Sequence, residues 1–190
     1  MSVQDVLILP GWQDSGAGHW QTRWEATHGY RRVQQHDWMR PLRGDWIARL
    51  EEVLLARQDQ GHAPALLTAH SLGCQLVAAW AACSRHTHLV KGALLVAPPD
   101  AERDDVRQML PSWAPVAMRR LPFKAAVIAS TDDPFCGLER AQSFAMAWGA
   151  AFIDAGPRGH LNAESGLGDW SQGHQVLLRL SDGTTPNKEN

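Results

Sequence analysis

The sequence has little cysteine and no excess of positive charge, and each of these shortages excludes a class of protein. Its three cysteines, Cys74, Cys83 and Cys136, contain no C-x-x-C pair and leave an odd number, which argues against a disulfide framework or a thiolate metal site. The formal net charge of -2 at pH 7 argues against a nucleic-acid partner, which normally needs a basic surface. We therefore expect a reduced, cytoplasmic protein without a metal.

The sequence also lacks an uninterrupted membrane segment. The apolar run Val6–Leu9 follows no basic region and ends at a Pro-Gly pair, so we expect a first strand rather than a signal peptide. Residues 63–83 are mostly apolar and long enough to span a membrane, but His70 and Ser71 lie in the middle, where hydrocarbon would penalise them. A strand followed by a buried helix explains the same residues, and we expect no membrane association.

Apolar runs of strand length alternate with segments of helical periodicity along residues 1–180. Strands are expected at Val3–Leu9, Arg31–Gln35, from Ala65 to the serine at 71, Lys91–Ala97, Lys124–Ser130 and Ala151–Asp154. Helices are expected at His19–His28, from Gly44 or Asp45 to Arg57, after Ser71 to Cys83, and at Leu138–Trp148 and Gln172–Leu180.

Strands that alternate with helices form one parallel sheet covered on both faces. The chain is thus predicted to be a single-domain α/β protein over residues 1–180, with about six parallel strands between two helix layers. The polar residues 181–190 are expected to form a disordered tail. The irregular segment 100–123 is too short for a separate cap domain.

The stretch Ala65–Val77 is typical of a nucleophile elbow, in which a serine sits on a sharp turn between a strand and a helix. Ser71 has Ala69 two residues before it and Gly73 two residues after it. Small residues are needed there because we expect the turn to bring the backbones of the strand and the helix close together. Ala69 stands where the common pattern has glycine, and the motif by itself also fits an ordinary turn.

Acidic residues and a histidine follow later strands, at the sheet edge where ligands bind in parallel α/β proteins. Asp132 and Asp133 follow the fifth expected strand, and His160 follows the last. The order Ser, Asp, His along the chain is that of the α/β-hydrolases. We predict Ser71 as nucleophile, His160 as general base and Asp133 as the acid that orients the imidazole. Asp132 and, less favoured, Asp100 remain alternatives for the acid.

The tetrahedral intermediate of acyl transfer needs backbone donors for its oxyanion. We predict that these are the amide of Leu72, directly after the serine, and that of Trp12 or a neighbour in the loop after the first strand. Trp113 and His19 are candidates for the substrate pocket, although core packing of Trp113 and loop anchoring by His19 would also explain these residues. His70 is expected to make a structural hydrogen bond because its side chain should point away from Ser71.

No cofactor is predicted. His86 and His88 have no acidic or thiol neighbour in the sequence and are expected at the surface rather than in a metal site. The segment Gly16-Ala17-Gly18 resembles the start of a dinucleotide-binding loop, but the third glycine is missing at its expected offset.

Several motifs together resemble one family of small serine hydrolases. They are Pro10-Gly11-Trp12, His19-Trp20, Asp45-Trp46, the elbow from Ala69 to Gly73, Ser130–Phe135 and Gly159–Asn162. The sequence is similar over nearly its whole length to the lidless α/β-hydrolases of YdeN and retinoblastoma-binding protein nine. The resemblance implies a six-stranded parallel core without the usual leading antiparallel strands. It also implies a triad of Ser71, Asp133 and His160.

The leading hypothesis is a cofactor-free serine hydrolase that cleaves small carboxylic esters through an acyl-enzyme, with amides and thioesters as other candidate substrates. The alternative is a binding module on a hydrolase scaffold, which would dock a partner protein through a tryptophan-rich face. A homodimer is compatible with either hypothesis. The sequence does not identify the acyl or alcohol group of the substrate.

Overall fold

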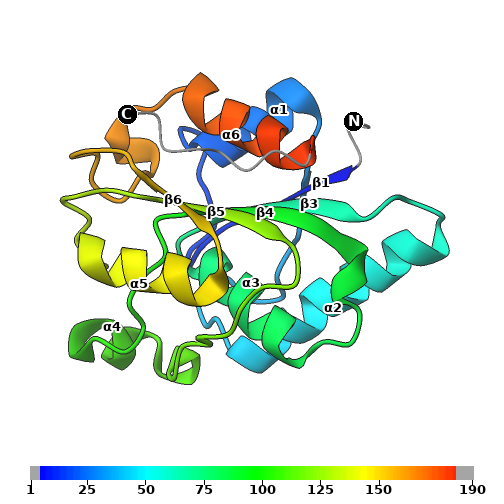
Figure 1. The fold of residues 1–190 in the computed structure, drawn as a ribbon, viewed down its shortest axis with the longest axis horizontal. Coiled ribbons are helices and arrows are strands. Elements are labelled where there is room, and N and C mark those ends of the chain that lie inside the picture. Colours follow the sequence, from blue (N-terminus) through cyan, green and yellow to red (C-terminus); the bar gives the residue numbers. More distant parts are fainter. Residues whose placement is uncertain (1–4, 183–190) are drawn as a thin grey trace.

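Six parallel strands form one sheet in the order β2-β1-β3-β4-β5-β6 in the computed structural model, which describes residues 5–182 (Figure 1). The strands are β1 (Val6–Leu9), β2 (Arg31–Arg32), β3 (Ala65–His70), β4 (Val90–Val96), β5 (Lys124–Ala129) and β6 (Ala151–Asp154). The chain moves from β1 outward to β2, then returns to β3 and continues in the other direction. Such a reversal creates a crevice at the carboxyl ends of the two inner strands, here β1 and β3.

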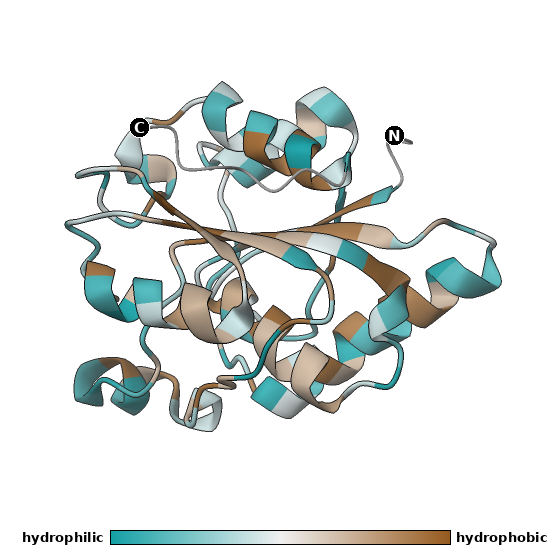
Figure 2. Ribbon diagram, in the orientation of Figure 1, coloured by the Kyte–Doolittle hydropathy of each residue, from teal (hydrophilic) through white to brown (hydrophobic). Residues whose placement is uncertain are grey.

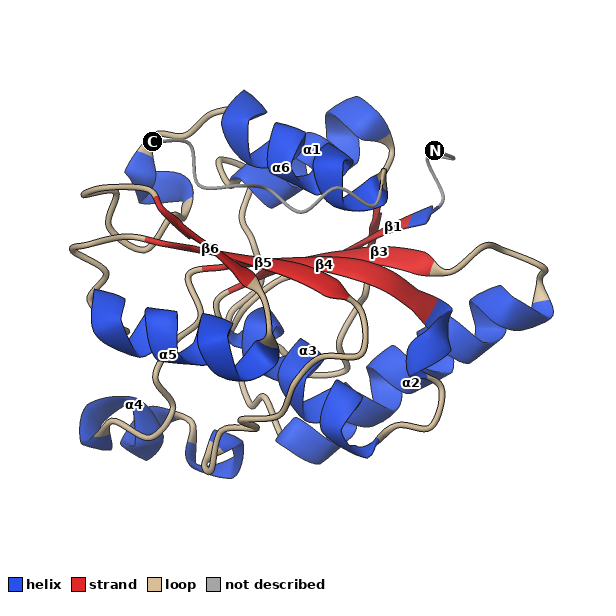
Figure 3. Ribbon diagram, in the orientation of Figure 1, coloured by secondary structure: helices blue, strands red, loops and turns tan. Residues whose placement is uncertain are grey.

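Helices cover both faces of the sheet, which gives the three layers predicted from the sequence (Figure 3). One face carries α1 (Trp20–His28) and α6 (Ser171–Ser181), and the other carries α2 (Arg43–Asp59), α3 (Leu72–Cys83) and α5 (Leu138–Trp148). The short α4 (Asp104–Met109) lies beyond α5, away from the sheet. The predicted α/β architecture is confirmed.

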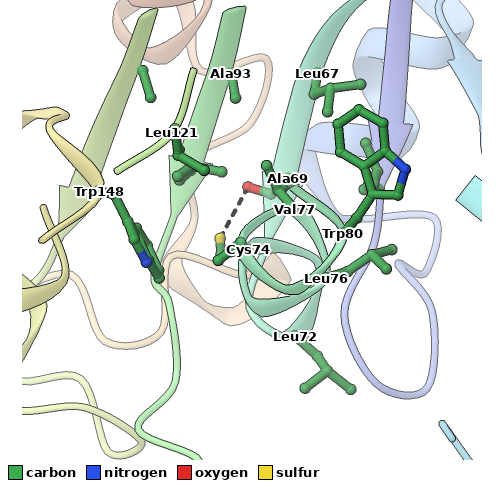
Figure 4. Packing of buried hydrophobic residues seen from close by; sticks show 14 of the residues in the cluster. Leu67, Ala69, Leu72, Cys74, Leu76, Val77, Trp80, Ala93, Leu121 and Trp148 are labelled. Carbon is green, nitrogen blue, oxygen red and sulfur yellow. Dashed lines mark hydrogen bonds between the residues drawn. The ribbon is translucent and has the colours of Figure 1, made fainter. Parts of the chain in front are cut away.

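The sheet separates two hydrophobic cores because successive strand side chains point to opposite faces. In β3, Leu67 and Ala69 belong to the core under α2, α3 and α5, whereas Leu66 belongs to the core under α1 and α6. The strands carry the most hydrophobic segments, and the outer sides of the helices are hydrophilic (Figure 2). Figure 4 shows the first core around α3, with Trp80 and Trp148 packed on either side of the helix.

The edge strand β2 is shorter than the predicted strand Arg31–Gln35. Its two residues pair with Leu7 and Ile8 of β1, which is itself only four residues long in the described structure. The side chain of Arg32 turns inward and forms ion pairs with Asp14 and Glu25 at 2.6 and 2.8 Å. The first predicted strand included Val3, which lies outside the described residues, as does most of the predicted tail at 181–190.

The segment between β4 and β5 is fixed against α2 by polar contacts. Trp113, in a short 3-10 turn (Pro111–Trp113), donates from its indole nitrogen to the carbonyl oxygen of Pro41 at 2.7 Å. Ser112 Oγ accepts from the backbone N–H of Arg43, the first residue of α2. The segment therefore forms a wall beside the sheet edge rather than a cap domain. Within residues 5–182, no helix is both long and apolar enough to cross a bilayer.

Candidate active site

Ser71 occupies a strained turn between β3 and α3. Its backbone dihedrals are φ 53° and ψ -123°, a conformation that residues other than glycine rarely adopt. Two backbone hydrogen bonds hold the turn, from Ser71 N–H to the Val96 carbonyl and from Cys74 N–H to the Ser71 carbonyl, both at 2.9 Å. The turn presents the serine side chain at the carboxyl edge of the sheet, as a nucleophile elbow does.

Gly73 must be a glycine because α3 approaches the end of β1. A Cβ atom at this position would lie 2.3 Å from the Leu9 carbonyl oxygen and 2.9 Å from that of Pro10. The predicted need for a small residue at position 73 is confirmed, and the backbone nearest to it is that of Leu9 and Pro10, at and just after the end of β1. Ala69, in contrast, points into the core beside α3, where a methyl group fits (Figure 4).

Gly11 brings the loop after β1 into contact with the serine. A Cβ atom on Gly11 would lie 2.7 Å from Ser71 Cβ and 3.2 Å from Ser71 Oγ. The Pro10-Gly11 pair at a strand end is a turn signal in the sequence, but the contact of Gly11 with the serine could not be predicted from it. Glycine lets this loop reach the serine, which places the following residue, Trp12, at the same site.

Ser71, His160 and Asp133 form one chain of hydrogen bonds. His160 Nε2 lies 2.9 Å from Ser71 Oγ, and His160 Nδ1 lies 2.9 Å from both carboxylate oxygens of Asp133. The Asp133 side chain is only 2% exposed and that of His160 only 9%, so water screens the pair weakly. With its proton on Nδ1 facing the carboxylate, the imidazole presents Nε2 as an acceptor for the serine hydroxyl. This is the geometry that a hydroxyl nucleophile and its base require.

Asp132 and Asp100 lie elsewhere. Asp132 accepts from Ser130 Oγ at 2.6 Å and from the Gly159 N–H at 2.7 Å, and these hydrogen bonds lower the pKa of its carboxyl group. It thereby joins the loop after β5 to the loop that carries His160. Asp100 forms an ion pair with Arg140 at 3.3 Å. Of the three acids considered from the sequence, the structure brings Asp133 to the imidazole.

The two predicted oxyanion donors lie beside the serine. Leu72 is the first residue of α3, so its N–H has no acceptor within the helix, and the positive end of the helix dipole lies here. Trp12 follows Gly11, and its indole nitrogen donates to the Met39 carbonyl at 3.1 Å. A second bond, from Gln13 N–H to the Trp38 carbonyl at 3.1 Å, also restrains this loop. The backbone amides of Leu72 and Trp12 remain predicted donors.

Ser71 opens into a cavity of about 380 Å3 with walls of different chemistry. The apolar part of the lining consists of Val106, Met109 and Leu110, in and after α4, together with Pro99 and Phe135. The polar part includes Asp14, His19, Asn162 and Glu164, and Trp12 also lines the cavity. The predicted pocket residue Trp113 does not line this cavity; it is 1% exposed and packs against Trp46. The prediction for Trp113 was therefore wrong.

The apolar wall from α4 was missed from the sequence. Val106, Met109 and Leu110 follow the i, i+3, i+4 spacing of one helix face, which was available as a signal. The prolines around them obscured this spacing.

Two buried histidines, His19 and His70, contribute to the cavity lining and pack beside the triad. His70 Nε2 donates to the backbone carbonyl of His160 at 2.9 Å, as its predicted structural role requires, and its ring packs edge-to-face on that of His19. His19 Nδ1 accepts from the Gln21 N–H at the start of α1, and its buried Nε2 atom has no hydrogen-bond partner among residues 5–182. Burial, followed by the charge of Arg32, lowers the pKa of His19 to about 3, and burial lowers that of His70 in the same direction.

His86 has a partner that sequence proximity did not reveal. Its Nδ1 lies 2.6 Å from Glu51 of α2, which also accepts from Trp80 Nε1 and Ser84 Oγ. The inference that no acidic residue lies near His86 was therefore wrong. Among residues 5–182, no group of three or more His, Cys, Asp or Glu side chains is arranged to hold a metal ion.

Comparison with known proteins identifies the class. A family model described as "Serine hydrolase" matches residues 6–179, and the chain belongs to this family. The structure is similar to a YdeN-like hydrolase from Pectobacterium atrosepticum, with 27% identity, a TM-score of 0.81, and coverage of 96% of this chain and 93% of that one.

Other solved structures share the fold. The ydeN gene product of B. subtilis has 22% identity and a TM-score of 0.73, with 94% of this chain and 99% of that chain covered. The carboxylesterase of Bacillus cereus has 14% identity and a TM-score of 0.60, with 94% and 88% covered. A search of curated proteins gave no match.

Proposed function

We propose that this protein is a cofactor-free serine hydrolase that cleaves small carboxylic esters through an acyl-enzyme. The observation that carries the proposal is the hydrogen-bond chain from Asp133 through His160 to Ser71, with each link at 2.9 Å. The buried carboxylate favours the imidazolium form that arises when His160 takes a proton, and it orients the ring. The three cysteines are free in the structure, which agrees with the proposed cytoplasmic location.

In the first half-reaction, Ser71 Oγ attacks the ester carbonyl while His160 Nε2 accepts the hydroxyl proton. The oxyanion of the tetrahedral intermediate accepts hydrogen bonds from the amides of Leu72 and Trp12. The intermediate collapses to an acyl-serine, and His160 returns the proton to the departing alcohol. In the second half-reaction, water attacks the acyl-serine with His160 as base, and the carboxylic acid and free Ser71 are released.

The size and lining of the cavity support the proposal that the substrate is a small ester with an apolar group. The cavity volume of about 380 Å3 is near the lower end of the range for small-molecule sites. The wall from α4 offers contact to an alkyl or aromatic group. Esters are proposed ahead of amides and thioesters. An alcohol leaves the tetrahedral intermediate more readily than an amine does, so ester cleavage needs less help with protonation of the leaving group.

The alternative of a protein-binding module has less support. It relied on a face rich in exposed tryptophan, but Trp20, Trp24, Trp46, Trp80, Trp113 and Trp148 are each less than 2% exposed. A protein that only binds a partner also has no use for a buried carboxylate aligned with an imidazole and a serine.

Labelling with a fluorophosphonate probe tests the proposal. The wild-type protein should be labelled at one serine, and Ser71→Ala should abolish both labelling and hydrolysis of p-nitrophenyl esters. Ser143→Ala is the matched control, because Ser143 lies on α5, outside the cavity that contains Ser71, and its hydroxyl donates to the Arg140 carbonyl of the same helix. Labelling that persists in folded Ser71→Ala would overturn the assignment.

A further inference from the structure

A second cavity lies on the α1/α6 side of the sheet, and no described residue lines both it and the catalytic cavity. Its volume is about 360 Å3, close to that of the catalytic cavity. The cavity is lined by residues at the ends of β5 and β6, in the loops on both sides of His160 and in the first turns of α6. Its apolar lining comprises Ile128, Ile153, Ala155, Leu161, Leu167 and Val176, and Trp170 forms a further part of the wall.

The lining includes apolar side chains that the fold leaves partly exposed. Ile153, Ala155, Leu167 and Val176 are each half-buried and are contributed by β6, the two loops that follow it and α6. Partly exposed apolar residues scattered singly over a surface need no explanation, but a hollow that gathers them is the usual form of a ligand site. An apolar chain that entered it would be stabilised by the removal of its methylene groups from water.

One charged residue lies among these apolar groups. Arg158 is the only charged side chain that lines the cavity within residues 5–182, and it is exposed. In the same part of the chain it forms no ion pair with a carboxylate. A guanidinium group pairs with a carboxylate through two parallel hydrogen bonds. The cavity thus combines an apolar interior with one positive group, which complements a molecule with an apolar body and an anionic end.

We propose that this cavity binds a small monocarboxylate with an apolar chain, with the carboxylate on Arg158 and the chain against Ile153 and Val176. The site is independent of the proposed catalytic function. The second cavity adjoins the loop that carries the catalytic base, because two of its lining residues, Arg158 and Leu161, flank His160 in the chain. Two anchors hold that loop, from Arg158 N–H to Ser130 Oγ at 2.8 Å and from Trp20 Nε1 to the Leu161 carbonyl at 2.9 Å.

Methyl NMR of the whole protein can locate the ligand. The sequence has four isoleucines, Ile8, Ile47, Ile128 and Ile153, of which the last two line the cavity. Titration with octanoate should shift the methyl signals of Ile128 and Ile153 and leave that of Ile47, on α2, unchanged. The methyl group of Met109 reports on the catalytic cavity in the same sample. Octylamine, which has the same chain and the opposite charge, should leave the Ile128 and Ile153 signals in place.

Two variants test the contacts. Arg158→Gln should weaken octanoate binding roughly fivefold or more through loss of the charged hydrogen bonds, whereas Arg85→Gln, which removes the same charge at an exposed position after α3, should not. Val176→Phe should fill the cavity and abolish the Ile153 shift. The proposal is overturned if millimolar octanoate shifts only Met109 or no signal, if octylamine binds equally well, or if Arg158→Gln binds like the wild type.

Discussion

Asp132 and Asp133 are neighbours in the chain but serve different parts of the structure. Asp133 is buried and faces the His160 imidazole, whereas Asp132 is exposed and accepts from Ser130 and Gly159. The sequence could place both acids in the correct loop but could not choose between them. The choice depends on the direction of each side chain in a tight turn, which no spacing rule gives.

This difference predicts unequal effects of removing the two charges. Asp133→Asn should lower kcat for ester hydrolysis by roughly a thousandfold or more, because the amide no longer stabilises the imidazolium or fixes the tautomer. Asp132→Asn, the matched change one residue earlier, should lower kcat less than about tenfold and mainly lower the midpoint of urea unfolding slightly, through weaker hydrogen bonds to Ser130 and Gly159. Steady-state kinetics and urea unfolding measure both. A larger kcat loss in Asp132→Asn would contradict the proposed acid.

At the scale of elements, the sequence predicts the bounds of regular helices and strands well and the structure of irregular segments poorly. Helix α5 begins and ends where its periodicity and Gly149 predict, and Gly149 has the left-handed φ of 67° typical of a helix stop. The segment from 100 to 123 was predicted only as irregular, because its prolines interrupt the periodic pattern. Its helix α4 packs against the 3-10 turn Pro111–Trp113, which is held to the start of α2, and it supplies the apolar wall of the cavity. Contacts between distant segments are not encoded in local periodicity.

Helix α4 is therefore predicted to set the preference for the apolar part of the substrate. Met109→Ala should reduce kcat/KM for hexanoyl esters about threefold to tenfold more than for acetyl esters, because a longer chain loses contact with the side chain. Met118→Ala is the control: Met118 is 41% exposed, like Met109 at 43%, but does not line the cavity. Kinetics with a series of p-nitrophenyl esters measure the ratio. Equal loss for all chain lengths would contradict contact between Met109 and the acyl chain.

At the scale of the whole molecule, buried uncharged histidines couple stability to pH. The pKa of His19 is lowered to about 3 in the folded protein, chiefly by burial, from an ordinary value of 6.5. Between these two values the unfolded chain binds a proton that the folded protein does not bind. The free energy of unfolding therefore falls as the pH falls below 6.5, by up to about 1.4 kcal/mol per pH unit for this residue, and the full contribution is present above 6.5.

The variant His19→Asn tests this coupling. Asparagine can still accept the hydrogen bond from Gln21 at the helix start but cannot titrate, so stability should fall less steeply between pH 6.5 and 4. His88→Asn, at an exposed position, should keep the wild-type slope. Urea unfolding at several pH values measures both slopes. An unchanged slope in His19→Asn would show that His19 is not the source of the acid sensitivity.

The contact of Gly73 with the carbonyls of Leu9 and Pro10 also has a kinetic consequence. The turn that carries Ser71 packs against the end of β1, and β1 is separated from its partner β3 along the chain by α1, β2 and α2. Local helix formation precedes such long-range strand pairing during folding. During refolding, far-ultraviolet circular dichroism should thus recover before labelling of the serine does. The rate at which reactivity toward a fluorophosphonate returns would then measure the rate at which β1, β3 and α3 come together late in folding.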